Sequence, residues 1–185
     1  MTLKKLIFLL FLGILISFFV YKNLKLKDEI KVEKEENLSS YYSNIIKDIN
    51  YTTVDLKGNE YIINASEGEI DLKNNEIIYL KNVTGFIKLK NSDNVNIKSD
   101  YGKYDMSNID TIFSKNVVIT YQDSKIISDN LDYSMARGTM IITKDVVFTN
   151  KENILHADMI EINTITKDTK ILMYDINKKV KIKNY

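Results

Sequence analysis

The sequence contains no cysteine, no proline and no tryptophan among its 185 residues, and it has one histidine, His156, and one arginine, Arg137. Without cysteine the chain forms no disulfide, no thiolate metal site and no lipid-modified amino terminus. A single histidine does not supply the ligand clusters of metal centres, so we expect neither a metal nor another cofactor. The net charge of +1 gives no excess of positive charge to bind phosphates, so we expect no nucleic-acid partner.

Motifs for catalysis are missing as well. No serine lies in a G-x-S-x-G elbow, and no glycine-rich phosphate loop is present. Glu67 and Glu69 form a carboxylate pair, but they occupy alternating positions of a strand pattern and are expected to face solvent. His156 lies between Leu155 and Ala157, where the same alternation points it outward. The sequence therefore predicts a protein that is not an enzyme.

The chain begins with an apolar segment. Residues 6–21 carry no charge, and lysines flank them on both sides. The length is short for a bilayer core of roughly 30 Å, but flanking lysines can extend the span. A cleaved signal peptide would need small residues near Tyr21, which are absent. We therefore expect a transmembrane anchor over residues 1–22, a charged stalk over 23–46 and a folded, exported domain over 47–185.

One pattern is repeated along the folded domain. Each unit contains a small residue within an apolar stretch, followed by a valine that closes the unit. The small residues are Ala65, Ser99, Ser128 and Ala157, and the closing valines are Val83, Val117, Val146 and Val180. The spacing is 18 residues in three units (65 to 83, 99 to 117 and 128 to 146) and 23 in the fourth (157 to 180). A period of this size indicates repeated supersecondary units.

Within each unit, apolar residues occupy positions −2, 0, +3 and +5 relative to the small residue. Side chains alternate across a strand, so this spacing describes two short strands separated by a one-residue slip, as at a bend or bulge. Asparagine-, glycine- and lysine-rich turns are expected near 57–59, 73–75, 91–94, 122–124, 137–138 and 150–153. The fold class is therefore all-β: an antiparallel β-jelly-roll or twisted sandwich.

The apolar faces of these strands are expected to form the interior of the roll. The residues that line it are Ile63, Ala65, Ile70, Val83, Ile87, Leu89, Ile97, Ser99, Tyr104, Val117, Ile119, Tyr121, Ile126, Tyr133, Val146, Phe148, Leu155, Ala157 and Ile162. Two interpretations are open. The interior is either an ordinary sandwich core, or a groove that parts along one seam and admits a lipid chain.

The repeated unit resembles the OstA-like β-jelly-roll of lipopolysaccharide transport proteins. Residues 58–65 match the opening segment of that family, and residues 126–133 match a later pair of strands. The whole layout, with an N-terminal span, a stalk and one roll, resembles the LptC family.

The resemblance implies a function. LptC-like proteins are anchored in the inner membrane with the roll in the periplasm, and they receive lipopolysaccharide from an ABC transporter of the LptB-LptF-LptG type. They pass it to an LptA-like bridge protein, with the acyl chains inside the roll. Rolls join edge to edge, which here implies a partner edge at Val180, Ile182 and Tyr185. The alternatives are a structural surface protein with a closed core, and an LptA-like soluble bridge protein with a cleaved signal.

Overall fold

The computed structural model describes residues 18, 21–22, 44–55, 58–90, 93–175, 177 and 179–184. The chain divides into two units, residues 1–43 and 44–185, and the second unit holds the strands. The expected anchor (1–22) and stalk (23–46) lie almost entirely outside the described residues; of the anchor, Phe18, Tyr21 and Lys22 are helical. Within the described part of the chain, no helix has the length and apolar character needed to cross a membrane.

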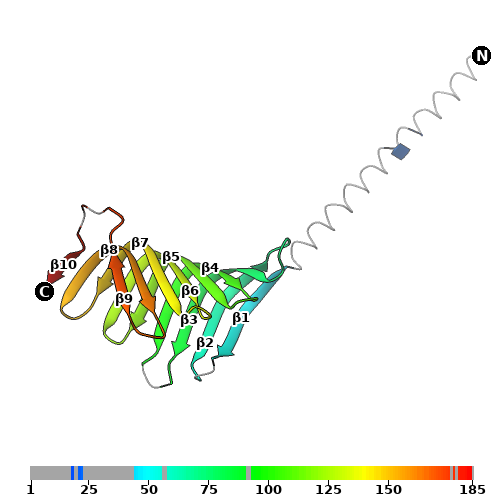
Figure 1. Cartoon of the computed structure of the whole chain (residues 1–185). Helices are drawn as coiled ribbons and strands as arrows, with labels where there is room; N and C mark the ends of the chain where they lie inside the picture. The colour runs from blue at the N-terminus through cyan, green and yellow to red at the C-terminus, as the bar shows by residue number, and fades with distance from the viewer. Residues whose placement is uncertain are drawn as a thin grey trace, which may run out of the picture. The chain divides into compact units, whose positions relative to one another are not determined.

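Ten strands form one sheet in the described part of the chain (Figure 1). Its all-β, antiparallel character confirms the sequence prediction, while the strands of the expected roll or sandwich belong to a single continuous sheet. They are β1 (Ile45–Val54), β2 (Glu60–Ile70), β3 (Ile77–Lys88), β4 (Val95–Asp105), β5 (Asp110–Tyr121), β6 (Ser124–Ser134), β7 (Thr139–Thr149), β8 (Asn153–Asn163), β9 (Thr169–Leu172) and β10 (Lys181–Asn184). Strands β1 to β8 pair in sequence order, and β10 follows β8 along the sheet. Strand β9 also pairs with β8. The sheet therefore has edges at β1 and at β9 and β10.

Each long strand bends where the sequence predicts a slip. The register shifts between Lys98 and Tyr101 of β4, and comparable shifts occur in the β5–β6, β6–β7 and β7–β8 pairs. The residue before three of the four closing valines has a positive φ: 51° at Asn82, 51° at Asn116 and 54° at Asp145. Asparagine and aspartate tolerate this left-handed conformation better than most side chains. The structure corrects one detail, because the two short strands of a unit are one continuous, bent strand.

The bends fold the sheet into two leaves that face each other. Leaf A contains residues 45–47, 67–70, 77–81, 101–105, 110–114, 130–134, 139–143, 159–163 and 169–172. Leaf B contains residues 49–54, 60–64, 83–88, 95–99, 117–121, 124–128, 146–149, 153–157 and 181–184. We call the line of bends between the leaves the spine.

Small and large side chains alternate along the spine. The closing valines pair with the small residues of the neighbouring strands: Val83 with Ser99, Val117 with Ser128, and Val146 with Ala157. All of these side chains are buried. A larger residue beside the valine would overfill the bend, so close packing explains why the repeat needs a small residue at this position.

The fourth unit differs because its last strand is split. Strand β9 pairs with residues 159–162 of β8 in leaf A, and β10 pairs with residues 153–156 in leaf B. The longer spacing from Ala157 to Val180 thus reflects the connection between Leu172, where β9 ends, and Lys181, where β10 begins. The expected C-terminal strand exists as β10, although Tyr185 lies outside the described residues.

Two turns were missed by the sequence analysis. Residues 106–109 and 164–166 turn the chain in leaf A, between β4 and β5 and between β8 and β9. Neither contains more than two turn-forming residues, and these stand beside Met or Ile, so the polar clusters that indicate the other turns are missing here. Instead, Asn108 Oδ1 accepts a hydrogen bond from Asp110 N (2.9 Å), and Asn163 Oδ1 accepts one from Ile165 N (2.9 Å). Such side-chain bonds stabilise a turn without glycine.

Candidate functional site

Every residue predicted to line the interior is buried or half-buried in the structure. The buried ones are Ala65, Val83, Ile87, Ile97, Ser99, Tyr104, Val117, Ile119, Ile126, Tyr133, Val146, Leu155 and Ala157. The half-buried ones are Ile63, Ile70, Leu89, Tyr121, Phe148 and Ile162. The predicted set therefore lies in the space between the leaves, although burial alone does not distinguish a core from a binding groove.

The sequence analysis missed the leaf A halves of β3, β5 and β7. Ile78, Leu80, Phe113, Met140 and Ile142 are at most 3% exposed and belong to the same interior. They lie before the closing valines, in stretches that the repeat pattern did not cover. Alternation was available as a signal, since Ile78 and Leu80, and likewise Met140 and Ile142, are two residues apart.

Close contacts join the two leaves. The rings of Tyr61 in leaf B and Tyr133 in leaf A stack with centroids 5.7 Å apart, and the rings of Tyr51 in β1 and Tyr104 in leaf A lie 5.1 Å apart. A Cβ atom added to Gly85 in leaf B would lie 3.0 Å from Phe113 Cζ in leaf A. Glycine at this position thus lets the phenylalanine ring reach across the interior.

A cavity of about 50 Å³ remains between the leaves near β1 to β6. Its lining includes Tyr61, Gly85, Thr111, Phe113 and Tyr133. By this measure one water molecule needs about 10–15 Å³, so the cavity holds a few water molecules at most. An acyl chain does not fit into it while the leaves stay in this position.

Among the described residues, the apolar interior is most exposed at its β10 end, whereas Ile49 of β1 at the other edge is buried. In leaf B, one inward row runs along Ile63, Gly85, Ile97, Ile119, Ile126, Phe148, Leu155 and Ile182. Ile119, in the middle of this row, is 5% exposed, whereas Ile182 at its β10 end is 62% exposed. The inward residues at the edges of leaf A show the same trend, with Ile171 of β9 38% exposed and Ile46 of β1 37% exposed. Apolar side chains thus reach solvent at each end of the roll.

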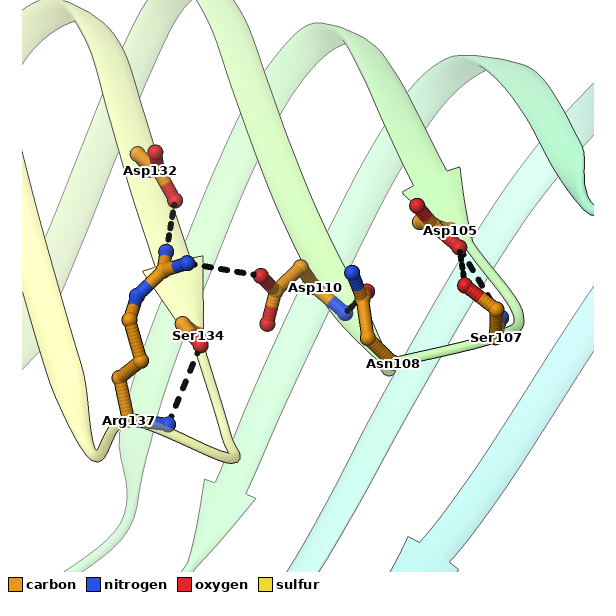
Figure 2. A network of polar contacts seen from close by, with 7 residues as sticks. All are labelled: Asp105, Ser107, Asn108, Asp110, Asp132, Ser134 and Arg137. Carbon is orange, nitrogen blue, oxygen red and sulfur yellow. Dashed lines mark hydrogen bonds and ion pairs between the residues drawn. The ribbon is translucent and has the colours of Figure 1, made fainter.

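A polar network lies at the edge of leaf A that is farthest from the spine, which we call the rim (Figure 2). It is next in sequence to the cavity-lining residues Thr111 and Tyr133. Arg137 binds Asp110 through Nη1 (3.3 Å to Oδ2) and Asp132 through Nη2 (3.4 Å to Oδ1). Its backbone N–H donates to Ser134 Oγ (3.2 Å). The sole arginine of the chain therefore connects the β6–β7 turn to Asp110, the first residue of β5.

Three tyrosines of the interior have shifted acidity. Burial raises the pKa of Tyr61, Tyr104 and Tyr133 above the usual value of about 10. The effect is largest at Tyr133, where the nearby Tyr61 adds to the effect of burial. Burial opposes ionisation because a phenolate between the leaves loses its hydration.

These shifts predict a limit of stability at high pH. Because the pKa values are raised in the folded state, the tyrosines stabilise the fold below about pH 10 and this contribution is lost as the pH rises further. We expect cooperative loss of the sheet's circular dichroism above pH 10, together with phenolate absorbance. Tyr133→Phe should move the transition to higher pH. Ordinary phenolate titration of all tyrosines with the sheet intact would contradict this.

Among the described residues, no group of three or more histidine, aspartate or glutamate side chains could hold a metal ion. His156 is exposed on the outer face of leaf B, as expected. Glu67 lies on the outer side of the sheet, where it binds Lys81 (2.6 Å). The apolar interior is therefore the feature of this domain that needs a functional explanation.

Comparison with known proteins tests the resemblance. The family model of lipopolysaccharide-assembly, LptC-related proteins matches residues 6–174. The chain belongs to the LptC family. The match confirms the resemblance drawn from the repeats, and it assigns the chain to a family that acts in lipopolysaccharide assembly.

One solved structure supports the fold of this LptC-family chain. LptH from Pseudomonas aeruginosa is described as the LptA homologous periplasmic component of the conserved lipopolysaccharide transport device. The alignment covers 66% of this chain and 92% of the LptH chain, with a TM-score of 0.50 and 9% sequence identity. At this identity the similarity shows the fold alone. No curated protein matches the sequence.

Proposed function

We propose that this protein carries lipopolysaccharide across the periplasm, with the acyl chains held between the two leaves and the sugars in water. The observation that carries the proposal is an apolar interior that runs from β1 to β10 and that, among the described residues, reaches solvent at its β10 end. A closed core would bury its last apolar side chains, whereas Ile182 is 62% exposed. Each buried CH₂ group stabilises a bound lipid by roughly 0.8 kcal/mol, so even part of an acyl chain gives a firm hold.

Loading requires the leaves to separate. The cavity of about 50 Å³ is smaller than an acyl chain, and the cross-leaf tyrosine pairs close the rim opposite the spine. The spine is the natural hinge, because it already contains register shifts and left-handed residues. The lipid then replaces the contacts between the leaves with contacts to its own chains, so opening needs little net energy.

The edges of the sheet provide the route in and out. An unpaired edge strand presents N–H and C=O groups to which another strand can add. We assign β1 to the donor side, an inner-membrane ABC transporter of the LptB-LptF-LptG type. The edge that includes β10, with Val180, Ile182 and Tyr185, is assigned to an LptA-like bridge protein. An anchor within residues 1–22 would hold the roll at the inner membrane.

Two other functions compete with this proposal. A structural protein with a permanently closed core would need no exposed apolar residues at the ends of its interior. A soluble bridge protein would lose its first residues by cleavage, and the mass of the mature amino terminus separates it from an anchored carrier. Both alternatives predict a different result from the experiment below or from that mass measurement.

Ile119 offers a direct test of the interior. Ile119→Asp places a carboxylate in the acyl-chain path, so we expect transport of lipopolysaccharide to the outer membrane to fail. Val118→Asp is the matched control, because Val118 is the adjacent residue on the outer face and pairs there with Lys98 and Ile127. Transport is measured in cells that depend on the variant, and folding by thermal unfolding of the purified chain.

The outcome is read only for variants that fold. If Ile119→Asp unfolds the domain, Ile119→Ser provides a milder polar substitution at the same position. Normal transport by a stably folded Ile119 variant would overturn the proposed function. Equal impairment by Ile119→Asp and Val118→Asp would show that the effect does not come from the interior.

A further inference from the structure

Large and small side chains alternate along the spine across the whole sheet. The register places a small residue beside a large one at every step from β1 to β8, and the row runs Ile49, Ala65, Val83, Ser99, Val117, Ser128, Val146 and Ala157. The last strand continues this row. His156 pairs with Lys181, so the next residues on the two strands, Ala157 and Val180, stand side by side. A large residue therefore stands at each end of the row, Ile49 at one edge and Val180 at the other.

The strands at the two edges also run in the same direction. Strand β1 starts in leaf A and ends in leaf B, and the chain passes likewise from β9 in leaf A to β10 in leaf B. The strands that carry the small residues, β2, β4, β6 and β8, run from leaf B to leaf A. All neighbouring strands of the described sheet pair antiparallel. A strand that continues the sheet beyond β10 therefore runs from leaf B to leaf A.

The edge formed by β9 and β10 is able to accept such a strand. Among the described strands, β9 and β10 pair only with β8, so each presents one backbone edge. The inward residues Ile171 and Ile182 on this edge are 38% and 62% exposed. Val180 is half-buried and packs against the apolar core. An added strand would bond to the backbone edge and cover these apolar side chains.

A second copy of this chain does not supply the missing strand. Its β1 would lie parallel to β10 and would bring Ile49 beside Val180. Its own β9–β10 edge would bring another Val180 beside the first. Every step of the existing row joins one large and one small side chain, so two large side chains would overfill the bend, and overfilling of a close-packed interior is destabilising.

We propose that the partner at the β9–β10 edge is a different chain, whose joining strand runs from leaf B to leaf A and places an alanine or a serine beside Val180. This inference rests on the proposed function, which assigns this edge to a partner. It adds the chemistry of the partner's first strand, which has to resemble β2, β4, β6 or β8 of this chain. It also explains why one copy does not join another, since both edges of this sheet end in a large residue.

Peptides copied from this chain test the size of the partner residue. The first probe is residues 124–134, the sequence of β6, which carries Ser128 at the bend. Fluorescence anisotropy measures binding of the labelled peptide to the purified full chain. The Ser128→Leu peptide should bind about tenfold more weakly, because leucine beside Val180 overfills the bend. The matched control is the Ile127→Leu peptide, which changes an outward-facing position and should bind like the first probe.

Exchanging the two sizes locates the contact. Val180→Ala in the full chain should bind the Ser128→Leu peptide about tenfold more tightly than the wild type does, because the large and the small residue have changed places. Hydrogen exchange of the β10 amides should slow when the first probe binds. Light scattering of the full chain should show no association of wild-type copies through their edges.

Four results would overturn this inference. They are no binding of the first probe, equal binding of the first probe and the Ser128→Leu peptide, no recovery of binding in Val180→Ala, and edge-to-edge association of the wild type. None of them contradicts the proposed function, which fails instead if a stably folded Ile119 variant transports lipopolysaccharide normally.

Discussion

Replacement of Phe113 by alanine is expected to lower the free energy of unfolding by about 3–5 kcal/mol, the usual loss for a fully buried phenylalanine. Phe113 is 1% exposed and reaches across the interior to Gly85. Truncation leaves a cavity that rigid neighbouring strands cannot fill. Chemical denaturation of the purified chain, followed by circular dichroism, measures the loss.

Ile112 is the matched control for this substitution. It precedes Phe113 on β5, faces outward and is 36% exposed. Ile112→Ala should change the free energy of unfolding by about 0.5 kcal/mol or less, because the Ile112 side chain is largely in contact with solvent. Similar losses at positions 112 and 113 would show that the leaves do not pack against each other as the structure has them.

Joining the leaves covalently is expected to stop lipid transport almost completely. The chain has no cysteine, so Tyr61→Cys together with Tyr133→Cys introduces the only two thiols. The ring centroids of the native tyrosines, one in leaf B and one in leaf A, lie 5.7 Å apart, so a bifunctional thiol reagent about as long as the two tyrosine side chains can replace their contact. Because loading requires the leaves to part, the joined protein should fold but carry no lipid.

Reversal provides the control for the joined protein. A reagent with an internal disulfide should restore transport after reduction. A second pair, Lys125→Cys with Thr149→Cys, joins partner residues of β6 and β7 within leaf B. That link leaves the seam free, so transport should continue. Full transport through the protein joined at positions 61 and 133 would mean that lipid does not pass between the leaves.

The repeat made much of this fold predictable from sequence. Ser128 is small because it pairs with Val117 at the bend, and Asn116 precedes that valine because the backbone there has a positive φ. Physical needs at the spine thus restrict residue types at fixed spacing. This is why the bends, the antiparallel class and the inward faces of leaf B were found without coordinates.

Three features of the fold could not be predicted because the sequence indicates them only weakly. Threonine is polar, so the sequence alone indicates that Thr111 faces solvent. Only its pairing with Tyr104 and Tyr133 on the neighbouring strands shows that it faces the space between the leaves. The turn at 106–109 is stabilised by the side chains of Asp105 and Asn108, and the apolar Met106 and Ile109 that flank its polar residues hide it in the sequence. The split of β9 from β10 could be read only as an irregular spacing, because both halves depend on pairing with β8.

The most direct measurement is photo-crosslinking in living cells from position 119, with position 118 as its partner. Ile119 faces the space between the leaves and is 5% exposed, while Val118 faces outward on the same strand. A photoreactive amino acid at position 119 should form an adduct with lipopolysaccharide, and the same amino acid at position 118 should not. Absence of an adduct at position 119 during active transport, or equal adducts at both positions, would contradict a path through the interior.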